Sequence, residues 1–278
     1  GESNASFFEV INPSGDIQYT NRHGFQLNYG VTLDQVKAEG ENMLDLWVPR
    51  AEQNLAQNIV DQQEAPAPFW EDYRGVMRFR FENLESFRTY NVDINIWIER
   101  SEIITRIFPA KVPSTYNTDS QLYKEYTSPA DTMPSGEQRW INLAATASGG
   151  YRNPYFAARQ IFNYLLARVN FTNAKEGDDL YAVYQSGAAD AYSFARIYCT
   201  LLRARGIPAR PVAGFLVASG GLVQRHLWAE VFIPGLGWMP VDPAVAKAPG
   251  LTGYAGEMLP EEFYFGNLDS QHVAFSRG

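Results

Sequence analysis

Two residues in the last quarter of the sequence could form a catalytic hydrogen-bonded pair. His226 and Trp228 alternate along one face of a predicted strand, HLWAEVFIP, and Asp242 ends the next one, GWMPVDPA. Antiparallel pairing of these strands would bring the Asp242 carboxylate beside the His226 imidazole. A carboxylate that holds one ring nitrogen leaves the other free to serve a nucleophile. A lone histidine on a strand is more often a hydrogen-bonded core or surface residue, so this interpretation depends on the surrounding motifs.

The segment SGAADAYSFARIYCTLLRARGIPAR, residues 186–210, predicts the helix that such a pair would serve. Asp190 can cap its start, and Gly206 followed by Pro208 ends it. Residue 191 therefore lies in the first turn, where free N–H groups and the helix dipole would lower the pKa of a thiol. Alanine stands at this position, Ala191. The helix has a buried apolar stripe at helical spacing, namely Phe194, Ile197, Tyr198, Leu201 and Leu202.

No neighbouring side chain replaces a nucleophile at position 191. Cys199 lies eight residues later, which is ~12 Å along the helix axis and ~80° around it, so we expect it to be a small buried apolar residue. Ser193 points away, about 200° around the helix, and Ser186 precedes the helix. Tyr184, Gln185 and the backbone N–H of residue 191 are candidates for an oxyanion site.

Composition excludes several classes of protein. The chain has 278 residues, of which 45% are apolar and 19% charged, and its net charge is −8. These values predict a folded protein of two domains. Lys and Arg form no cluster, so we expect no nucleic-acid partner. The single cysteine excludes an intrachain disulfide and a cysteine metal site. The apolar runs fall short of the ~20 residues of a membrane span.

The pattern of apolar residues divides the chain in two. Stretches at 43–49, 75–81 and 90–100 alternate apolar and polar residues or carry β-formers, so residues 1–110 predict a β-sandwich-like domain. The one segment of this part with a weak helical pattern is VTLDQVKAEGENM, residues 31–43. Residues 108–138 are rich in Pro, Ser, Thr and Gly and predict a linker region. Helices at 139–149 and 153–169, then strands after residue 209, predict an α+β domain over residues 111–278.

Several ordered motifs resemble the transglutaminase-like superfamily. YSFARIYCTLLRARGIPAR, HLWAEVFIPGLGW and MPVDPA follow the family's motifs nearly letter for letter, and NPYFAARQIFNYLLARV is similar to the helix that precedes them. The resemblance covers residues 110–278 firmly. LDLWVP in the first half and YFGNLDSQHVAFSRG at the end resemble stretches found beside that core, so residues 1–110 are covered loosely.

The resemblance implies a papain-like core of helices packed on an antiparallel sheet, with a Cys-His-Asp triad. His226 takes the place of the general base and Asp242 that of the orienting carboxylate, while Trp228 and Trp238 would pack near the cleft or in the core. The implied chemistry is acyl transfer or amide hydrolysis on a peptide or protein, including a cell-wall peptide, without a cofactor. The resemblance also implies a bacterial, extracytoplasmic protein.

Ala191 is where this chain departs from the family. An engineered Cys→Ala change, a natural loss and a shifted register are three explanations, and LLRARGIPAR makes the third the weakest. A protein without the nucleophile could be a pseudoenzyme that binds peptides or cell-wall fragments. Such a module could use an aromatic set that comprises Trp228, Trp238, Tyr254 and Tyr264, if these are exposed and not in the core. A metal hydrolase is a distant third hypothesis, because His23, His226 and His272 lack the paired spacing of metal ligands.

Overall fold

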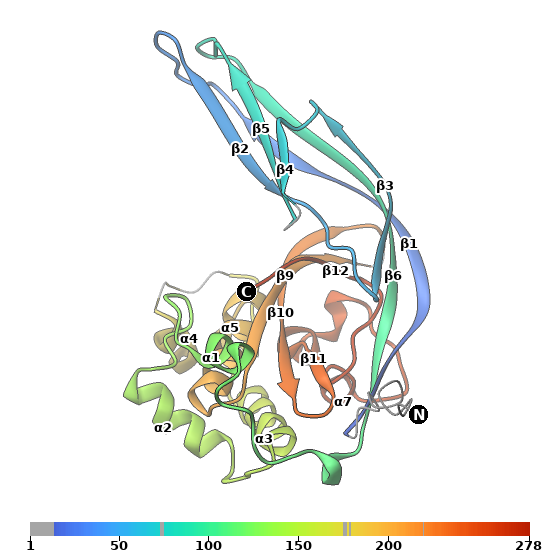
Figure 1. Cartoon of the computed structure of the whole chain (residues 1–278), viewed down its shortest axis with the longest axis vertical. Coiled ribbons are helices and arrows are strands. Elements are labelled where there is room, and N and C mark those ends of the chain that lie inside the picture. The colour runs from blue at the N-terminus through green and yellow to red at the C-terminus, as the bar shows by residue number, and fades with distance from the viewer. Residues whose placement is uncertain (1–13, 73–74, 175–176, 178, 219) are drawn as a thin grey trace, which may run out of the picture.

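The computed structural model describes residues 14–278 except 73–74, 175–176, 178 and 219. Figure 1 shows an elongated part made only of strands and a second part in which helices pack beside a sheet. Two long strands, β1 and β6, run from the first part along the flank of the second. The chain thus combines antiparallel sheets with a group of helices, as the sequence predicts.

Two three-stranded antiparallel sheets form the elongated part, in the orders β1-β6-β3 and β2-β5-β4. Every second residue of β6 from Val92 to Ile98 is buried, and these side chains share an apolar cluster with Met77 and Phe79 of β5. This alternation is typical of a sheet with one face in a core, and it confirms a sandwich-like arrangement. The strands are β1 Gly15–Leu33, β2 Met43–Pro49, β3 Gln57–Ala65, β4 Trp70–Asp72, β5 Val76–Glu82 and β6 Tyr90–Ile107.

Strands β1 and β6 are longer than the sequence pattern indicates. The prediction of a helix near residues 31–43 is wrong. Strand β1 continues to Leu33, and no regular element occupies residues 34–42. At its far end, β6 joins the second part, where the Ile103 N–H donates to the Leu268 carbonyl and the Thr105 N–H donates to Asn267 Oδ1. The boundary near residue 110 follows the end of β6 and stays a prediction.

The second part begins with short helices and ends in a four-stranded antiparallel sheet of order β11-β10-β9-β12. The expected linker contains the short 3-10 helix η2 and the α-helix α1, whose start is capped by Ser120. The remaining elements are η2 Pro109–Lys111, α1 Gln121–Thr127, α2 Gln138–Ala147, α3 Pro154–Leu166, β7 Asn170–Phe171, α4 Leu180–Ser186, β8 Ala188–Ala189, α5 Ala191–Ala204, β9 Ala209–Val217, β10 Val223–Ile233, β11 Gly237–Val241, α6 Pro243–Lys247, η3 Pro249–Leu251, α7 Pro260–Phe263 and β12 His272–Arg277.

Helix α5 is the central helix of the second part. The Ser193 N–H donates to Asp190 Oδ1 at 2.8 Å, so Asp190 caps the helix as predicted. The predicted apolar stripe is fully buried against neighbouring helices and against β9 and β10. Each such side chain contributes roughly 1.5–3 kcal/mol when it leaves water, which fixes the helix on the sheet. The structure's described helices are all too short or too polar to cross a membrane.

A buried ion-pair cluster joins the strands of this sheet. Glu230 on β10 accepts hydrogen bonds from Arg210 on β9 at 2.8 Å and from Arg277 on β12 at 3.1 Å. Arg277 also contacts Glu52, which precedes β3. Burial raises the pKa of Glu230, and the charge and hydrogen bond of Arg210 together with the charge of Arg100 oppose this effect. The cluster therefore links both parts of the chain.

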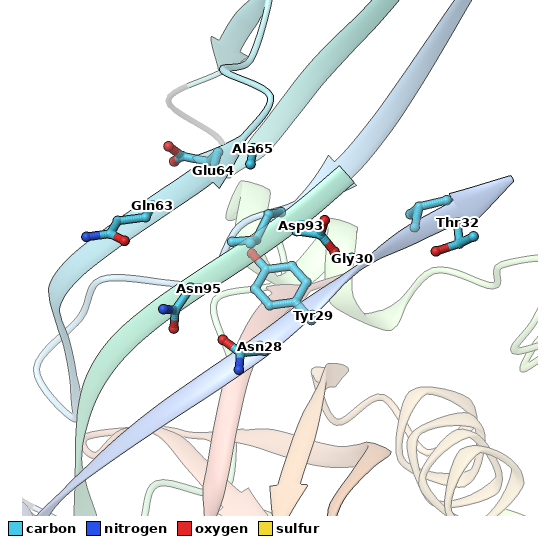
Figure 2. Close-up of a pocket in the computed structure, with 11 residues that line it drawn as sticks. Asn28, Tyr29, Gly30, Thr32, Gln63, Glu64, Ala65, Asp93 and Asn95 are labelled. Carbon is cyan, nitrogen blue, oxygen red and sulfur yellow. The ribbon is translucent and has the colours of Figure 1, made fainter. Parts of the chain in front are cut away.

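A polar groove of about 680 Å³ lies on the elongated part. Figure 2 shows the amide side chains of Asn28, Gln63 and Asn95 around it, together with Glu64 and Asp93. Its lining residues come from β1, β3 and β6, far in sequence from His226 and Asp242.

Gly214 allows β9 and β12 to approach. It stands opposite His226 on one side and Ala274 on the other, and a side chain there would collide with the Val273 carbonyl oxygen. We expect Gly214→Ala to lower the free energy of unfolding by about 1–3 kcal/mol, because the backbone must shift. Urea unfolding measures this, with Gly24→Ala as the control, since Gly24 lies in β1 with open space around it. Equal stability of the two variants would contradict this account.

Candidate active site

The Asp242 carboxylate is the centre of the site. Asp242 directly follows β11 and caps α6, because the Val245 N–H donates to Asp242 Oδ1 at 3.0 Å. The backbone N–H of Asp242 donates to the Tyr264 carbonyl at 2.9 Å. The side chain is fully buried. These two bonds fix the carboxylate and leave Oδ2 for other partners.

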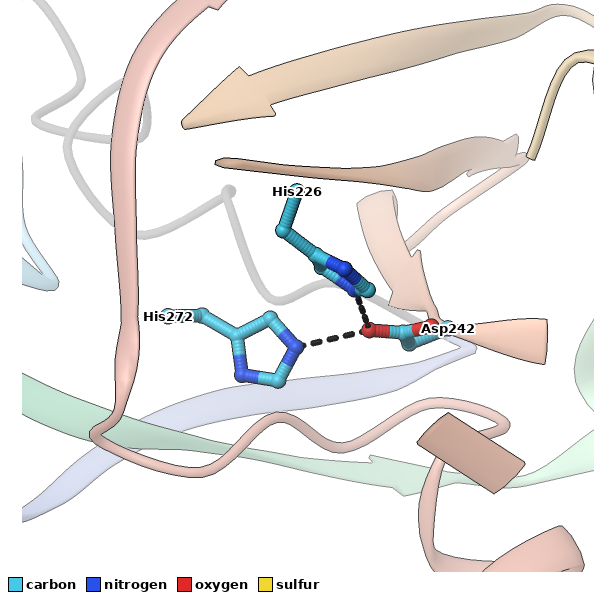
Figure 3. Close-up of side chains that lie close together, drawn as sticks. All are labelled: His226, Asp242 and His272. Carbon is cyan, nitrogen blue, oxygen red and sulfur yellow. Dashed lines mark hydrogen bonds and ion pairs between the residues drawn. The ribbon is translucent and has the colours of Figure 1, made fainter. Parts of the chain in front are cut away.

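His226 is one of these partners. Its Nε2 donates to Asp242 Oδ2 at 2.6 Å, as Figure 3 shows. The predicted antiparallel pairing of β10 and β11 produces this contact, with Ala229 opposite Val241. The Trp228 ring stacks beside His226 at 6.2 Å between centroids, and both side chains are buried. Since Nε2 is bound, Nδ1 is the ring nitrogen of His226 that Asp242 leaves free.

His272 is the second partner, and the sequence did not indicate it. Its Nε2 lies 2.7 Å from the same Asp242 Oδ2, and its Nδ1 lies 2.7 Å from Asp269 Oδ1. Figure 3 shows the two imidazoles converging on one carboxylate. His272 is the first residue of β12, which is separated from β10 by β9. On β9, Gly214 stands opposite His226, and Leu216 stands opposite His272.

Further hydrogen bonds extend this network away from His226. Tyr264 donates its hydroxyl to Asp269 Oδ2 at 2.6 Å, and the Thr252 hydroxyl lies 3.0 Å from the Tyr264 hydroxyl. The Gln271 N–H donates to Asp269 Oδ1 at 2.9 Å. Hydrogen bonds therefore connect four side chains in a row in which imidazole and carboxylate alternate: His226, Asp242, His272 and Asp269.

The charges in the network stabilise one another. Burial alone would raise the pKa of Asp242, but the charge and hydrogen bonds of His226 and His272 outweigh it and hold that pKa below its usual range. Burial also opposes the charged form of His272, yet Asp269 and Asp242 raise its pKa to about 9. The pKa of Asp269 is lowered despite its burial, chiefly by His272.

The three central residues also form a set of metal-ligand types, because two imidazole nitrogens and one carboxylate oxygen lie within 4.8 Å of one another. Two ligands on one tetrahedral zinc ion, each about 2.1 Å from the metal, stand roughly 3.4 Å apart. The observed separations of 2.6 and 2.7 Å are shorter and are those of hydrogen bonds. We therefore describe the cluster as a hydrogen-bonded network.

Ala191 is the first residue of α5 and is buried. The helix packs against β10, the strand that carries His226. On the same helix, burial raises the pKa of the Cys199 thiol to about 12, which agrees with an apolar packing role. The Ser186 hydroxyl is bound to the backbone carbonyls of Val183 and Ala188.

The oxyanion candidates lie on α4, next to α5. The Tyr184 hydroxyl is 3.4 Å from that of Tyr164, and the Gln185 side chain is exposed. Within the described residues, neither side chain hydrogen-bonds to His226 or Asp242. Trp238 packs elsewhere, beneath the Arg210 guanidinium at 3.9 Å and beside Tyr126. The backbone N–H at residue 191 is the candidate that belongs to a helix N-terminus.

The aromatic set that a binding module could use is mostly internal. Trp228 and Tyr264 are fully buried, and Trp238 and Tyr254 are half-buried. Exposed aromatic side chains lie on both parts of the chain. Tyr151, Phe156 and Tyr192 are exposed on the second part, and Trp47 and Phe69 flank Arg78 on the elongated part. The core interpretation therefore holds for Trp228 and Tyr264.

The raised pKa of His272 predicts a pH-dependent stability. Its stabilising contribution is complete below the unfolded value of 6.5 and is lost as the pH rises through about 9. The full loss corresponds to about 3 kcal/mol of unfolding free energy. We expect urea unfolding between pH 6 and pH 9.5 to show this decline in the chain as given and a flatter dependence in His272→Gln. Parallel pH profiles for the two proteins would contradict the assignment.

Comparison with known proteins identifies the second part of the chain. Residues 141–243 match the family model described as the transglutaminase-like superfamily. A protein-glutamine gamma-glutamyltransferase of Pseudomonas aeruginosa is 37% identical over 87 residues, which cover 28% of this chain and 13% of that protein. The matched segment is thus a small share of the relative's length.

One solved structure shares the fold over most of the chain. A candidate cysteine protease from Cytophaga hutchinsonii superposes with a TM-score of 0.67 at 16% identity and covers 94% of this chain and 83% of its own. The periplasmic domain of TgpA from Pseudomonas aeruginosa gives a TM-score of 0.41 at 18% identity, covering 80% of this chain and 77% of its own. The family match shows that the chain carries a domain of the transglutaminase-like superfamily over residues 141–243.

Proposed function

We propose that this chain is a scaffold for acyl transfer or amide hydrolysis by a nucleophile at position 191, with His226 as general base and Asp242 as its orienting carboxylate. The observation that carries the proposal is the buried 2.6 Å hydrogen bond between His226 Nε2 and Asp242 Oδ2, which leaves Nδ1 for a proton from the nucleophile. As given, the chain is inactive, because the Ala191 methyl group cannot attack a carbonyl.

With a thiol at position 191, the reaction has two stages. His226 Nδ1 takes the thiol proton, and the thiolate attacks the amide carbonyl carbon to form a tetrahedral intermediate. The C–N bond breaks as the His226 imidazolium gives its proton to the departing amine, which leaves a thioester. Water then hydrolyses the thioester, or a second amine accepts the acyl group. Asp242 stabilises the imidazolium and holds its Nε2–H throughout.

The substrate is an amide of a glutamine side chain or of a peptide backbone. The relative named a protein-glutamine gamma-glutamyltransferase supports the first class, and the candidate cysteine protease supports the second. Which nucleophile resolves the thioester, an amine or water, separates transferase from hydrolase. An extracytoplasmic location, with a cell-wall peptide among the substrates, belongs to the same proposal.

Ala191→Cys tests the scaffold directly. We expect the thiol at position 191 to react with iodoacetamide at pH 6 at least about 10-fold faster than an ordinary thiol of pKa ~8.5, because the helix start and His226 favour the thiolate. Alkylation rate against pH is the measurement, and the unmodified chain is the blank, since burial raises the pKa of Cys199 to about 12.

His226→Ala in the Ala191→Cys background should return the thiol to ordinary reactivity. His23→Ala is the matched control, because His23 is an exposed histidine on β1. Rates that follow an ordinary thiol with His226 present would sink the proposal. Ammonia release from glutamine peptides, with and without an added amine, then distinguishes transfer from hydrolysis.

The second candidate is a non-catalytic module that binds peptides or cell-wall fragments. Ala191 itself favours it, because the hydrogen bonds that His226 and His272 make to Asp242 do not involve the side chain at position 191. If this candidate is right, we expect the protein with Ala191 to bind glutamine peptides or glycan–peptide fragments at micromolar concentrations, as measured by calorimetry. We also expect Ala191→Cys to bind them equally and turn none over. Absence of binding to both fragment classes would exclude it.

A further inference from the structure

His272 lies between two carboxylates, and this position determines its charge. Its Nε2 is 2.7 Å from Asp242 Oδ2, and its Nδ1 is 2.7 Å from Asp269 Oδ1. An ionised carboxylate only accepts hydrogen bonds, so each ring nitrogen must carry a proton to make both contacts. A ring with two N–H groups is an imidazolium. The geometry thus requires a buried cation at Asp242 Oδ2, whereas the Val245 N–H binds Oδ1.

We propose that His272 is a positioning residue, an imidazolium that holds the Asp242 carboxylate ionised and aligned for His226. The inference rests on the proposed function, because its effect on chemistry passes through His226. Among the residues that the structure describes, the Asp242 carboxylate has three donors, namely His226 Nε2, His272 Nε2 and the Val245 N–H. Removal of one donor from a fully buried carboxylate disfavours its charged form.

The groups that face His272 support a fixed cation. Its ring meets the Trp228 ring edge-on at 5.1 Å, the His226 ring at 5.5 Å and the Tyr264 ring at 6.2 Å. Asp242 and Asp269 supply the two negative charges in direct contact. The charge of Arg100 also interacts with that of Asp269. The groups in direct contact with the His272 ring nitrogens are thus both anions.

Asp269 connects this cation to the surface. It lines a groove of about 640 Å³ with His23, Glu102 and Tyr254, and its side chain is 12% exposed. The groove lies at one end of the network and His226 at the other. A substitution of Asp269 should therefore alter the reactivity that His226 confers, although the two side chains do not touch.

Nuclear magnetic resonance of the chain as given tests the charge without any activity. The chain has three histidines, so ¹⁵N-histidine spectra resolve each ring. We expect one imidazole to keep both N–H protons at pH 8 and to lose this signature in His272→Gln but not in His23→Gln. If the His272 ring titrates near 6.5 or shows a single N–H at pH 7, the imidazolium assignment is overturned.

Alkylation in the Ala191→Cys background tests positioning. We expect His272→Leu to slow alkylation at pH 6 about 10- to 100-fold and to move the profile towards the ordinary thiol pKa of ~8.5. His272→Gln, which keeps one donor for Asp242, should retain part of the rate. Asp269→Asn alters the network at its exposed end and provides a variant with less risk to folding. His23→Gln should leave the profile unchanged.

The outcomes separate this inference from the proposed function. If Ala191→Cys is reactive and all His272 and Asp269 variants keep its profile, positioning by His272 is overturned and the proposed function stands. If Ala191→Cys is unreactive, the proposed function fails and positioning fails with it. The spectra still decide whether His272 is a buried imidazolium.

Discussion

The structure of the second part depends on one buried carboxylate. Asp242 is removed from water, and an ion in the protein interior is tolerated only when donors replace its hydration. Here β10 supplies His226, β12 supplies His272 and α6 supplies a backbone N–H. Each donor comes from a different element. Satisfying the carboxylate therefore requires β10, β11, β12 and α6 to take their places together, so the condition for folding is also the condition for orienting His226.

A second buried acid on the same sheet has different partners. Glu230 is held by the guanidinium groups of Arg210 and Arg277, which do not give up protons in proteins. Asp242 is held by imidazoles, which exchange protons near neutral pH. Two residues of β10, His226 and Glu230, thus belong to two different kinds of network, one with imidazoles and one with guanidinium groups. The arginine cluster joins the strands and the amino-terminal part, whereas the imidazole network keeps a group whose protonation can change.

The sequence predicted what is local or carried by motifs. The cap and buried stripe of α5, the strands around His226 and the contact with Asp242 follow from periodicity and from adjacent strands. His272 was missed because its contact with Asp242 spans 30 residues and depends on strand order, since β12 returns beside β9. The length of β1 and β6 was missed for a related reason: pairing with each other and packing against the second part sustain these strands where local alternation ends. The exposure of Trp228 and Tyr264 likewise depends on tertiary packing.

The side chain of Ala191 takes no part in the hydrogen bonds of the imidazole–carboxylate network. The imidazoles and carboxylates satisfy one another, and none of their hydrogen bonds involves the residue 191 side chain. Loss of a thiol at the helix start therefore leaves these hydrogen bonds intact, whereas loss of Asp242 or His272 removes a partner from a buried charge, at a cost of about 3–5 kcal/mol. Selection for stability alone would keep the histidines and aspartates after activity had gone. The intact pair of His226 and Asp242 is thus expected both of an enzyme changed at one residue and of a natural pseudoenzyme, and turnover of a substrate by a thiol restored at position 191 is the property in which the two differ.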